Sequence, residues 1–231
     1  MTFLIAQGYK VRSINSMLAA LMSLFHYLNW NDCRVKNIKL QKEIFALKEK
    51  ELTKAEYQKL LMAAQEHETL KLILQTICST GIRVSELKYF TVEAISKNKS
   101  TIEVSCKGKN RIIMIPGILL KALRRYIKKK KITTGHIFIN EKGNPICRKS
   151  IWAQMKKLCK KANVSSQKVF PHNLRKLFAR SFYKKERDIV KLADVLGHSS
   201  IETTRIYIMS TGKEHQRIVD HLDLIRDIDV T

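Results

Sequence analysis

LGHSSIETTRIYI, residues 196–208, joins the predicted end of one helix to a second short helix. Residues 188–196 have the apolar spacing of an amphipathic helix, and Gly197 is a typical residue for ending one. His198 then lies at the exit of that helix, and Tyr207 follows it by nine positions. Taken singly, the histidine is more often a turn residue and the tyrosine more often a core aromatic. The rest of the chain decides between that interpretation and a functional one.

The chain has 231 residues, enough for one large domain or for a small domain joined to a larger one. Its 45% hydrophobic content allows a substantial core, and no apolar run approaches the roughly 20 residues of a membrane-spanning helix. We therefore expect no membrane association. The five cysteines are scattered without a CxxC pair, which indicates reduced thiols in a cytoplasmic protein and argues against a zinc site or a disulfide framework.

The net charge of +24 is concentrated in the middle of the sequence. Residues 104–185 contain 23 lysines and arginines and a single acidic residue, Glu141, for a net charge of +22. Residues 186–231 carry −3 and residues 1–103 carry +5. A lysine-rich protein can scatter solvated lysines without binding anything, but here acidic residues are almost absent and not merely outnumbered. The distribution predicts binding to a nucleic acid.

The apolar pattern predicts a mainly α fold with one small antiparallel β-sheet, an α+β class. Residues 11–30 are expected to form an amphipathic helix, and a charged stretch to about residue 52 is expected to link two domains. A capping box from Thr53 to Glu56 predicts the start of the next helix. TIEVSC (101–106) and RIIMIP (111–116) predict a β-hairpin around KGKN.

Between and after these elements, the remaining chain is predicted to be mostly helical. A helix is expected through residues 70–80, with a break at Gly81 and another helix beginning near Val84. From Leu119 onward we expect helices, apart from a short extended piece, HIFIN, at residues 136–140.

Two motifs near the hairpin carry charged residues that could act at a site. TGIRVSEL places Arg83 just after a glycine and Glu86 one helical turn later. This spacing usually makes a surface ion pair. CKGKNR places Lys107 and Lys109 at the tip of the predicted hairpin, where exposed lysines are normally only solubilising.

A third motif, PHNLRKLFAR, begins with a proline, which favours a helix start. The spacing puts His172 and Arg175 one turn apart on the same face of that helix. A metal site is disfavoured because the guanidinium would repel a cation. An anion shared by the two side chains is the better explanation.

Together these motifs supply two arginines, a lysine and two histidines, which can bind the oxygens of a phosphate and move protons around it. A tyrosine is a competent nucleophile toward phosphorus and yields an ester instead of free hydrolysis. The sequence has no acidic cluster for Mg²⁺ and no GxxxxGK[ST] motif. A two-metal nuclease and an ATP-driven enzyme are therefore disfavoured, and we expect no cofactor and no metal.

The order and spacing of TGIRVSEL, KGK, HNLRKLFA and LGHSSIETTRIYI, after the opener LTKAEYQKLL, resemble the tyrosine recombinase, or phage integrase, family over about residues 53–210. The resemblance implies a tyrosine-recombinase catalytic domain at residues 51–231 that ends in a docking helix. A partial helical core-binding domain and linker are expected at residues 1–50. The family often has His-Thr after the second arginine, where this chain has Lys176 and Leu177.

The resemblance also implies roles for individual residues. Tyr207 is the expected nucleophile, Glu86 is the expected supporting acid, and the expected activating residues are Arg83, Lys107, His172, Arg175 and His198. Further contacts with DNA are expected from Lys109, Arg111, Arg148, Lys149 and Lys176.

The function implied is site-specific cleavage and rejoining of DNA strands through a 3′-phosphotyrosyl intermediate, without metal or ATP. The expected partners are double-stranded DNA, further copies of the chain in a synaptic tetramer, and an accessory directionality factor. We expect a cytoplasmic, nucleoid-associated protein. Residues 214–228 have the apolar spacing of a helix that needs a groove. The resemblance implies that this helix docks in a neighbouring subunit, with docking on its own domain as the alternative.

Two further interpretations stay open. A type IB topoisomerase uses the same chemistry without a synaptic complex, and a DNA-binding protein of the same fold could be catalytically silent. The short chain and the GH-x₈-Y spacing argue against the first, and the presence of all six core residues argues against the second. A relaxase would need a histidine triad for a metal, which the sequence lacks.

Overall fold

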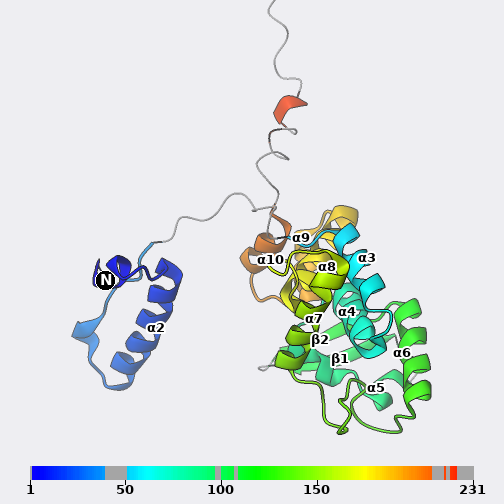
Figure 1. The fold of residues 1–231 in the computed structure, drawn as a ribbon. Helices are drawn as coiled ribbons and strands as arrows, with labels where there is room; N and C mark the ends of the chain where they lie inside the picture. The colour runs from blue at the N-terminus through cyan, green and yellow to red at the C-terminus, as the bar shows by residue number, and fades with distance from the viewer. Residues whose placement is uncertain are drawn as a thin grey trace, which may run out of the picture. The chain divides into compact units, whose positions relative to one another are not determined.

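The computed structural model consists of two compact units, Met1–Ile44 and Phe45–Thr231 (Figure 1). The residues described are 2–39, 51–96, 100–106, 109–209, 216 and 219–222, without the side chains of Cys106 and Lys109. The expected domain boundary at residue 50 lies outside the described residues and stays a prediction. None of the described helices is long and apolar enough to cross a membrane.

The N-terminal unit is small and helical, and its elements are α1 (Thr2–Ala6), α2 (Val11–Tyr27) and the 3₁₀ helix η1 (Asn31–Cys33). Among the described residues of this unit, Ile14 and Leu18 on α2 are buried, as the amphipathic spacing predicts. The helix ends three residues earlier than expected, because Asn29 adopts a left-handed φ of 57° that a continuing helix does not allow.

In its described residues the second unit is mainly helical with one two-stranded sheet, which confirms the predicted α+β class. Helix α8 packs against α4, α9 and α10, and Figure 1 shows α9 and α10 beside it. Leu74, Ile77 and Leu123 are fully buried in the main core. The helices are α3 (Lys54–Ala63), α4 (Glu68–Thr80), η3 (Val84–Tyr89), α5 (Val92–Ser96), α6 (Gly117–Lys130), α7 (Arg148–Ala162), α8 (Pro171–Glu186), α9 (Ile189–Leu196) and α10 (Ile201–Ile208).

Local signals in the sequence fix several helix ends of this unit. The capping box at α3 is confirmed, since the Thr53 hydroxyl accepts from the Glu56 amide and the Glu56 carboxylate accepts from the Thr53 amide. Gly81 ends α4 at a left-handed φ of 65°, and Gly197 ends α9 at 64°. At Gly81 a Cβ would lie 2.4 Å from the Phe178 ring, so a larger residue does not fit.

The hairpin consists of β1 (Thr101–Cys106) and β2 (Lys109–Met114) in an antiparallel pair. The second strand begins two residues earlier than the sequence analysis predicts and stops before Ile115. The reason is main-chain pairing, which places Lys109 opposite Cys106 and carries the ladder toward the turn. The predicted four-residue KGKN loop is therefore too long.

Two further elements differ from the sequence expectation. The helix predicted near Val84 is a 3₁₀ helix, and α6 begins at Gly117 instead of Leu119, directly after Pro116 as its N-cap. The extended piece HIFIN makes only isolated bridges, pairing His136 with Thr91 and Ile139 with Pro145. It does not add a third strand to the sheet within the described residues.

Candidate functional site

Arg175, in the second turn of α8, lies at the centre of the site and is only 1% exposed. Its Nη1 donates to the Gly81 carbonyl at 2.6 Å, and its Nη2 donates to the Leu196 carbonyl at 2.7 Å. Burial, and then the charge of Arg83, lower the pKa of Arg175 to about 10. No described residue accepts a hydrogen bond from its Nε. The guanidinium therefore joins the ends of α4 and α9 and keeps one buried donor unused.

His198 is held between an arginine and a threonine. Its Nε2 lies 2.9 Å from Nη2 of Arg175, and its Nδ1 lies 2.9 Å from Oγ1 of Thr204. Because an arginine only donates, Nε2 accepts, and the neutral ring must carry its proton on Nδ1 and donate it to Thr204. Burial, and then the charge of Arg175, lower the pKa of His198 to about 4, so the ring is neutral at pH 7. In this arrangement Nε2 is an acceptor, whereas a hydrogen bond donated to a phosphate would need a proton there.

Thr204 is a site residue that the sequence analysis misses. It is fully buried, and its hydroxyl is the partner of the histidine nitrogen that faces away from Arg175. The signal was available, because Thr204 lies three residues, about one helical turn, before Tyr207. A buried hydroxyl at that position needs a polar partner, and His198 supplies it.

Tyr207 lies on α10 and is 7% exposed. Its ring meets the rings of His172 and His198 edge to face, each with 5.0 Å between ring centroids. The guanidinium carbon of Arg175 lies 6.0 Å from the centre of the Tyr207 ring. The structure thus brings these four predicted residues together from α8, the turn after α9, and α10.

His172, in the first turn of α8, is exposed on one side and packs against Tyr207 on the other. Loss of solvent on the packed side, and then the positive charge of Lys176, lower the pKa of His172 below its usual 6.5. The charges of Arg175, Arg83 and Arg148 act in the same direction. The ring is therefore mostly neutral at pH 7 and has a lone pair that can accept a proton.

Glu86 is buried, with 3% of its side chain exposed, and binds two arginines. Its Oε1 lies 3.1 Å from Nη1 of Arg83, and its Oε2 accepts from the Arg83 amide at 2.7 Å and from Nη2 of Arg111. These donors compensate the loss of water around the carboxylate. The interpretation of Arg83 and Glu86 as an ordinary surface pair does not hold, although Arg83 keeps 44% of its side chain exposed.

An open hollow of about 930 Å³ adjoins this cluster. Side chains from three places line it, including Arg83 and Glu86 of the α4–η3 region, Ile112 and Met114 of β2, and His198 after α9. The hollow gives a charged group from outside access to the partly exposed Arg83.

Comparison with known proteins adds independent evidence. The model of the phage integrase family matches residues 50–214. The chain belongs to the phage integrase family. It is 32% identical to the tyrosine recombinase XerA of Pyrococcus furiosus over 234 residues, which cover 96% of this chain and 78% of that protein. It is 36% identical to the tyrosine recombinase XerH of Campylobacter jejuni over 141 residues, which cover 59% of this chain and 40% of that protein. Its enzyme class is that of the tyrosine-type site-specific DNA recombinases.

Solved structures of the family share the fold. The crystal structure of XerA recombinase aligns with a TM-score of 0.65 and 24% identity, over 97% of this chain and 80% of that one. XerH site-specific recombinase bound to its palindromic difH substrate aligns with a TM-score of 0.72 and 21% identity, over 93% of this chain and 68% of that one.

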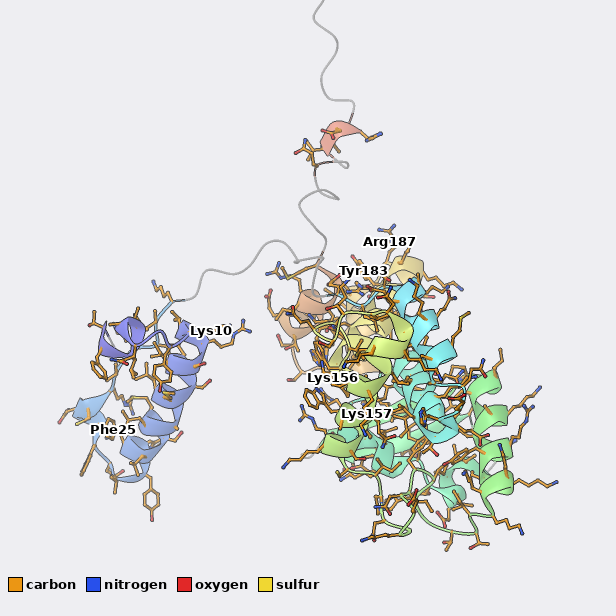
Figure 2. The ribbon with its side chains drawn as sticks, in the orientation of Figure 1. Lys10, Phe25, Lys156, Lys157, Tyr183 and Arg187 are labelled. Atoms are coloured by element: carbon orange, nitrogen blue, oxygen red, sulfur yellow. The ribbon has the colours of Figure 1, made fainter. Side chains whose placement is uncertain are left out.

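The other predicted site residues of the recombinase differ in how far their side chains are exposed to solvent. Lys107 lies outside the described residues, as does the side chain of Lys109. Arg148 and Lys149 are exposed in the first turn of α7, and Lys176 is half-buried on α8. The first turn of α7 thus holds two positive charges and no acidic residue, and these charges repel the positive end of the helix dipole. An anion bound at this helix end would offset that repulsion. Two further lysines of the basic segment, Lys156 and Lys157, follow on the same helix α7 (Figure 2).

Arg111, which the sequence analysis expects to contact DNA, has most of its side chain buried. Its side chain is only 10% exposed, and its Nη1 donates to the Val195 carbonyl at 3.0 Å while Nη2 pairs with Glu86. The guanidinium is thus engaged inside the recombinase. Its contact with DNA stays a prediction, and the sequence alone does not distinguish this buried arginine from the exposed basic residues around it.

Proposed function

We propose that this chain cleaves and rejoins DNA strands at specific sites through a 3′-phosphotyrosyl intermediate. The observation that carries the proposal is the arrangement around Tyr207, whose ring contacts His172 and His198 beside the buried Arg175. Arg83 lies close enough for its charge to act on both histidines and on Arg175. Positive charge and a proton acceptor thus surround a tyrosine, as attack on a phosphodiester requires.

In the proposed reaction the Tyr207 oxygen attacks the scissile phosphorus. A phosphorus–oxygen bond forms to the tyrosine, and the bond from phosphorus to the 5′-oxygen breaks. The products are a 3′-phosphotyrosine and a free 5′-hydroxyl, so no net bond energy is lost. A 5′-hydroxyl from a second duplex can reverse the step and exchange the strands.

The role proposed for each site residue follows from its charge and its protonation state. Neutral His172 accepts the tyrosine proton, which a free tyrosine with a pKa of about 10 holds firmly at neutral pH. Arg83 and Arg175 bind the non-bridging oxygens, and the unused Nε of Arg175 supports that role. His198 donates to the phosphate from Nε2 after Arg175 has turned to the phosphate and the ring proton has moved from Nδ1 to Nε2, with the Thr204 hydroxyl then donating to Nδ1. Lys107 protonates the leaving 5′-oxygen, a role that rests on the family resemblance.

A nicked "suicide" DNA tests this function directly. On such a substrate the strand segment after the cleavage site diffuses away, so the covalent intermediate accumulates. The proposal expects a protein–DNA adduct that survives denaturant, disappears on protease treatment and carries the DNA 3′ end. Cleavage without an adduct would contradict the proposal, and relaxation of supercoiled DNA regardless of sequence would favour the topoisomerase alternative.

DNA affinity is expected to fall steeply with salt, because residues 104–185 carry a net charge of +22. Each phosphate contacted contributes roughly 0.9 log unit of binding constant per log unit of salt. Arg148→Gln should lower the slope by about one contact, since Arg148 is exposed at the start of α7. Fluorescence anisotropy at several salt concentrations measures both slopes. A flat plot for the unmodified chain would show that the lysines are only solvated surface.

We further propose that four copies assemble on two DNA sites through the C-terminal tail. Most of the predicted helix at residues 214–228 lies outside the described residues, and the described Val219 and Leu222 are exposed. Deleting residues 214–231 should leave single-site binding nearly intact and abolish the complex of two duplexes. Native gel shifts with crosslinking decide the point. Survival of a four-copy complex would refute docking between copies, and loss of folding would indicate docking within one copy.

The remaining parts of the proposal concern the N-terminal region and the cell. We propose residues 1–50 as a partial core-binding domain, tested by the loss of DNA affinity when they are removed. We also propose a cytoplasmic, nucleoid-associated enzyme with a directionality factor. Equal rates of forward and reverse recombination with the purified chain alone would argue against that factor.

A further inference from the structure

We propose that Arg111 is a positioning residue that fixes the root of the β1–β2 hairpin to the phosphate-binding residues and so controls protonation of the leaving oxygen. This inference rests on the proposed function, because it concerns the delivery of a proton from the hairpin in that reaction. It assigns to a residue first expected at the DNA surface a role inside the protein.

The contacts of Arg111 join three separate segments of the chain. The residue itself lies on β2, its Nη2 pairs with Glu86 of η3, and its Nη1 donates to the carbonyl of Val195 on α9. The same Glu86 carboxylate holds the amide and the guanidinium of Arg83. One side chain therefore connects the hairpin to the Arg83 support and to the helix that leads into His198.

The stem of Arg111 also fits closely against the turn that carries His198. A Cβ on Gly197 would lie 2.5 Å from Cδ of Arg111 and 3.3 Å from its Nε. Gly197 has a left-handed φ of 64°, so glycine suits the backbone as well as the close approach. Strand β2 and α9 meet at this point.

The hairpin register places this anchor near the turn. Arg111 is opposite Val104, and Lys109 is opposite Cys106 in the last described pair before residues 107 and 108. Val104 itself is buried. The root is therefore fixed by a buried contact and an ion pair, only four positions from Lys107 in the sequence. Because Arg111 and Lys107 are so close in the sequence, loss of the Arg111 contacts is expected to misplace the proton donor.

A direct role in DNA binding fits the observations less well. With 10% of its side chain exposed, Arg111 would have to leave the buried Glu86 carboxylate before it reached a phosphate. That would remove one of the donors that make burial of Glu86 tolerable. The geometry favours an internal contact that persists when DNA binds.

The decisive variant is Arg111→Met, which keeps an unbranched stem against Gly197 and removes the guanidinium. Cleavage of ordinary suicide DNA should fall by about 100-fold, the loss expected for a displacement of roughly 1 Å at a reacting group. On DNA whose bridging 5′-oxygen is replaced by sulfur, the rate should return to within a few-fold of the unmodified enzyme on the same DNA. A thiolate leaves without a proton, so a misplaced proton donor no longer matters.

DNA affinity and salt slope complete the test. Both should be unchanged in Arg111→Met, whereas Arg148→Gln lowers the slope. An equal loss of rate on the oxygen and sulfur substrates would overturn the proposal, because Arg111 would then act through Arg83 or the fold. A slope lowered by one contact would overturn it in favour of a DNA contact.

Arg111→Lys keeps the test informative if the methionine variant does not fold. Lysine retains the charge beside Glu86 but lacks the planar fork that also reaches Val195. It should show a smaller loss of rate with the same sulfur rescue, and absence of rescue would again refute the positioning role. Failure of the proposed function is recognised separately, because the unmodified chain would then form no covalent adduct on either DNA.

Discussion

Tyr207→Phe is expected to abolish the covalent adduct while DNA binding and the fold survive. The change removes one oxygen and keeps the ring that packs between His172 and His198. Loss of a nucleophile that acts with its partners as a unit can cost on the order of 10⁶-fold, so the adduct should fall below detection. Denaturing gels with labelled suicide DNA measure the adduct, and anisotropy measures binding.

Tyr183→Phe is the matched control for this variant. Tyr183, labelled in Figure 2, lies on α8 and packs against the same small apolar cluster as Tyr207. It should lose no adduct formation, because nothing in the proposed reaction uses its hydroxyl. A protease-sensitive adduct in Tyr207→Phe would show that another residue attacks. Loss of the adduct in Tyr183→Phe would show that the assay reports packing of the cluster and not the nucleophile.

Lys107→Ala is expected to block cleavage of ordinary DNA and to spare DNA with a bridging 5′-sulfur. A general acid contributes typically 10²–10⁴-fold, and that factor should be lost only on the oxygen substrate. The two substrates differ only in the leaving atom, oxygen or sulfur. The comparison therefore tests proton donation by Lys107 without requiring the position of its side chain. Rates from the same suicide assay on the two DNAs measure it.

Lys109→Ala serves as the control, since Lys109 is the neighbouring lysine at the start of β2. It should retain cleavage of both substrates apart from a modest loss of affinity. Equal losses on oxygen and sulfur in Lys107→Ala would exclude leaving-group protonation by that residue. A sulfur-rescued defect confined to Lys109→Ala would move the role to Lys109.

Much of the fold follows from signals that act over a few residues. The Thr53 capping box and the glycines at 81 and 197 set helix ends through backbone geometry that neighbouring residues already specify. The apolar spacing of residues 70–80 and 188–196 likewise predicts α4 and α9, because one face of each must be buried. The gathering of Arg175, His198 and Tyr207 followed from recognising the order of the motifs, not from local physics.

What could not be predicted depends on pairing between distant residues. The Glu86–Arg111 pair spans 25 positions, and the hydrogen bond from Arg111 to Val195 spans 84. The charge count of residues 104–185 includes Arg111, although its guanidinium pairs with Glu86 and Val195 inside the protein. The net charge of residues 104–185 therefore overstates the charge available to DNA. The extension of β2 to Lys109 was missed for a related reason, since main-chain pairing decided it.

The burial of Arg175 links catalysis to the stability of the whole unit. A nearly inaccessible guanidinium with one unused donor, and with other arginines close by, makes the folded state less favourable than a neutral core would. An anion that binds only to the folded protein at this point adds RT ln(1 + [L]/Kd) to its stability. Folding and phosphate binding are thus thermodynamically coupled. A rise in the enzyme's melting temperature therefore measures how far its active site is occupied by an anion.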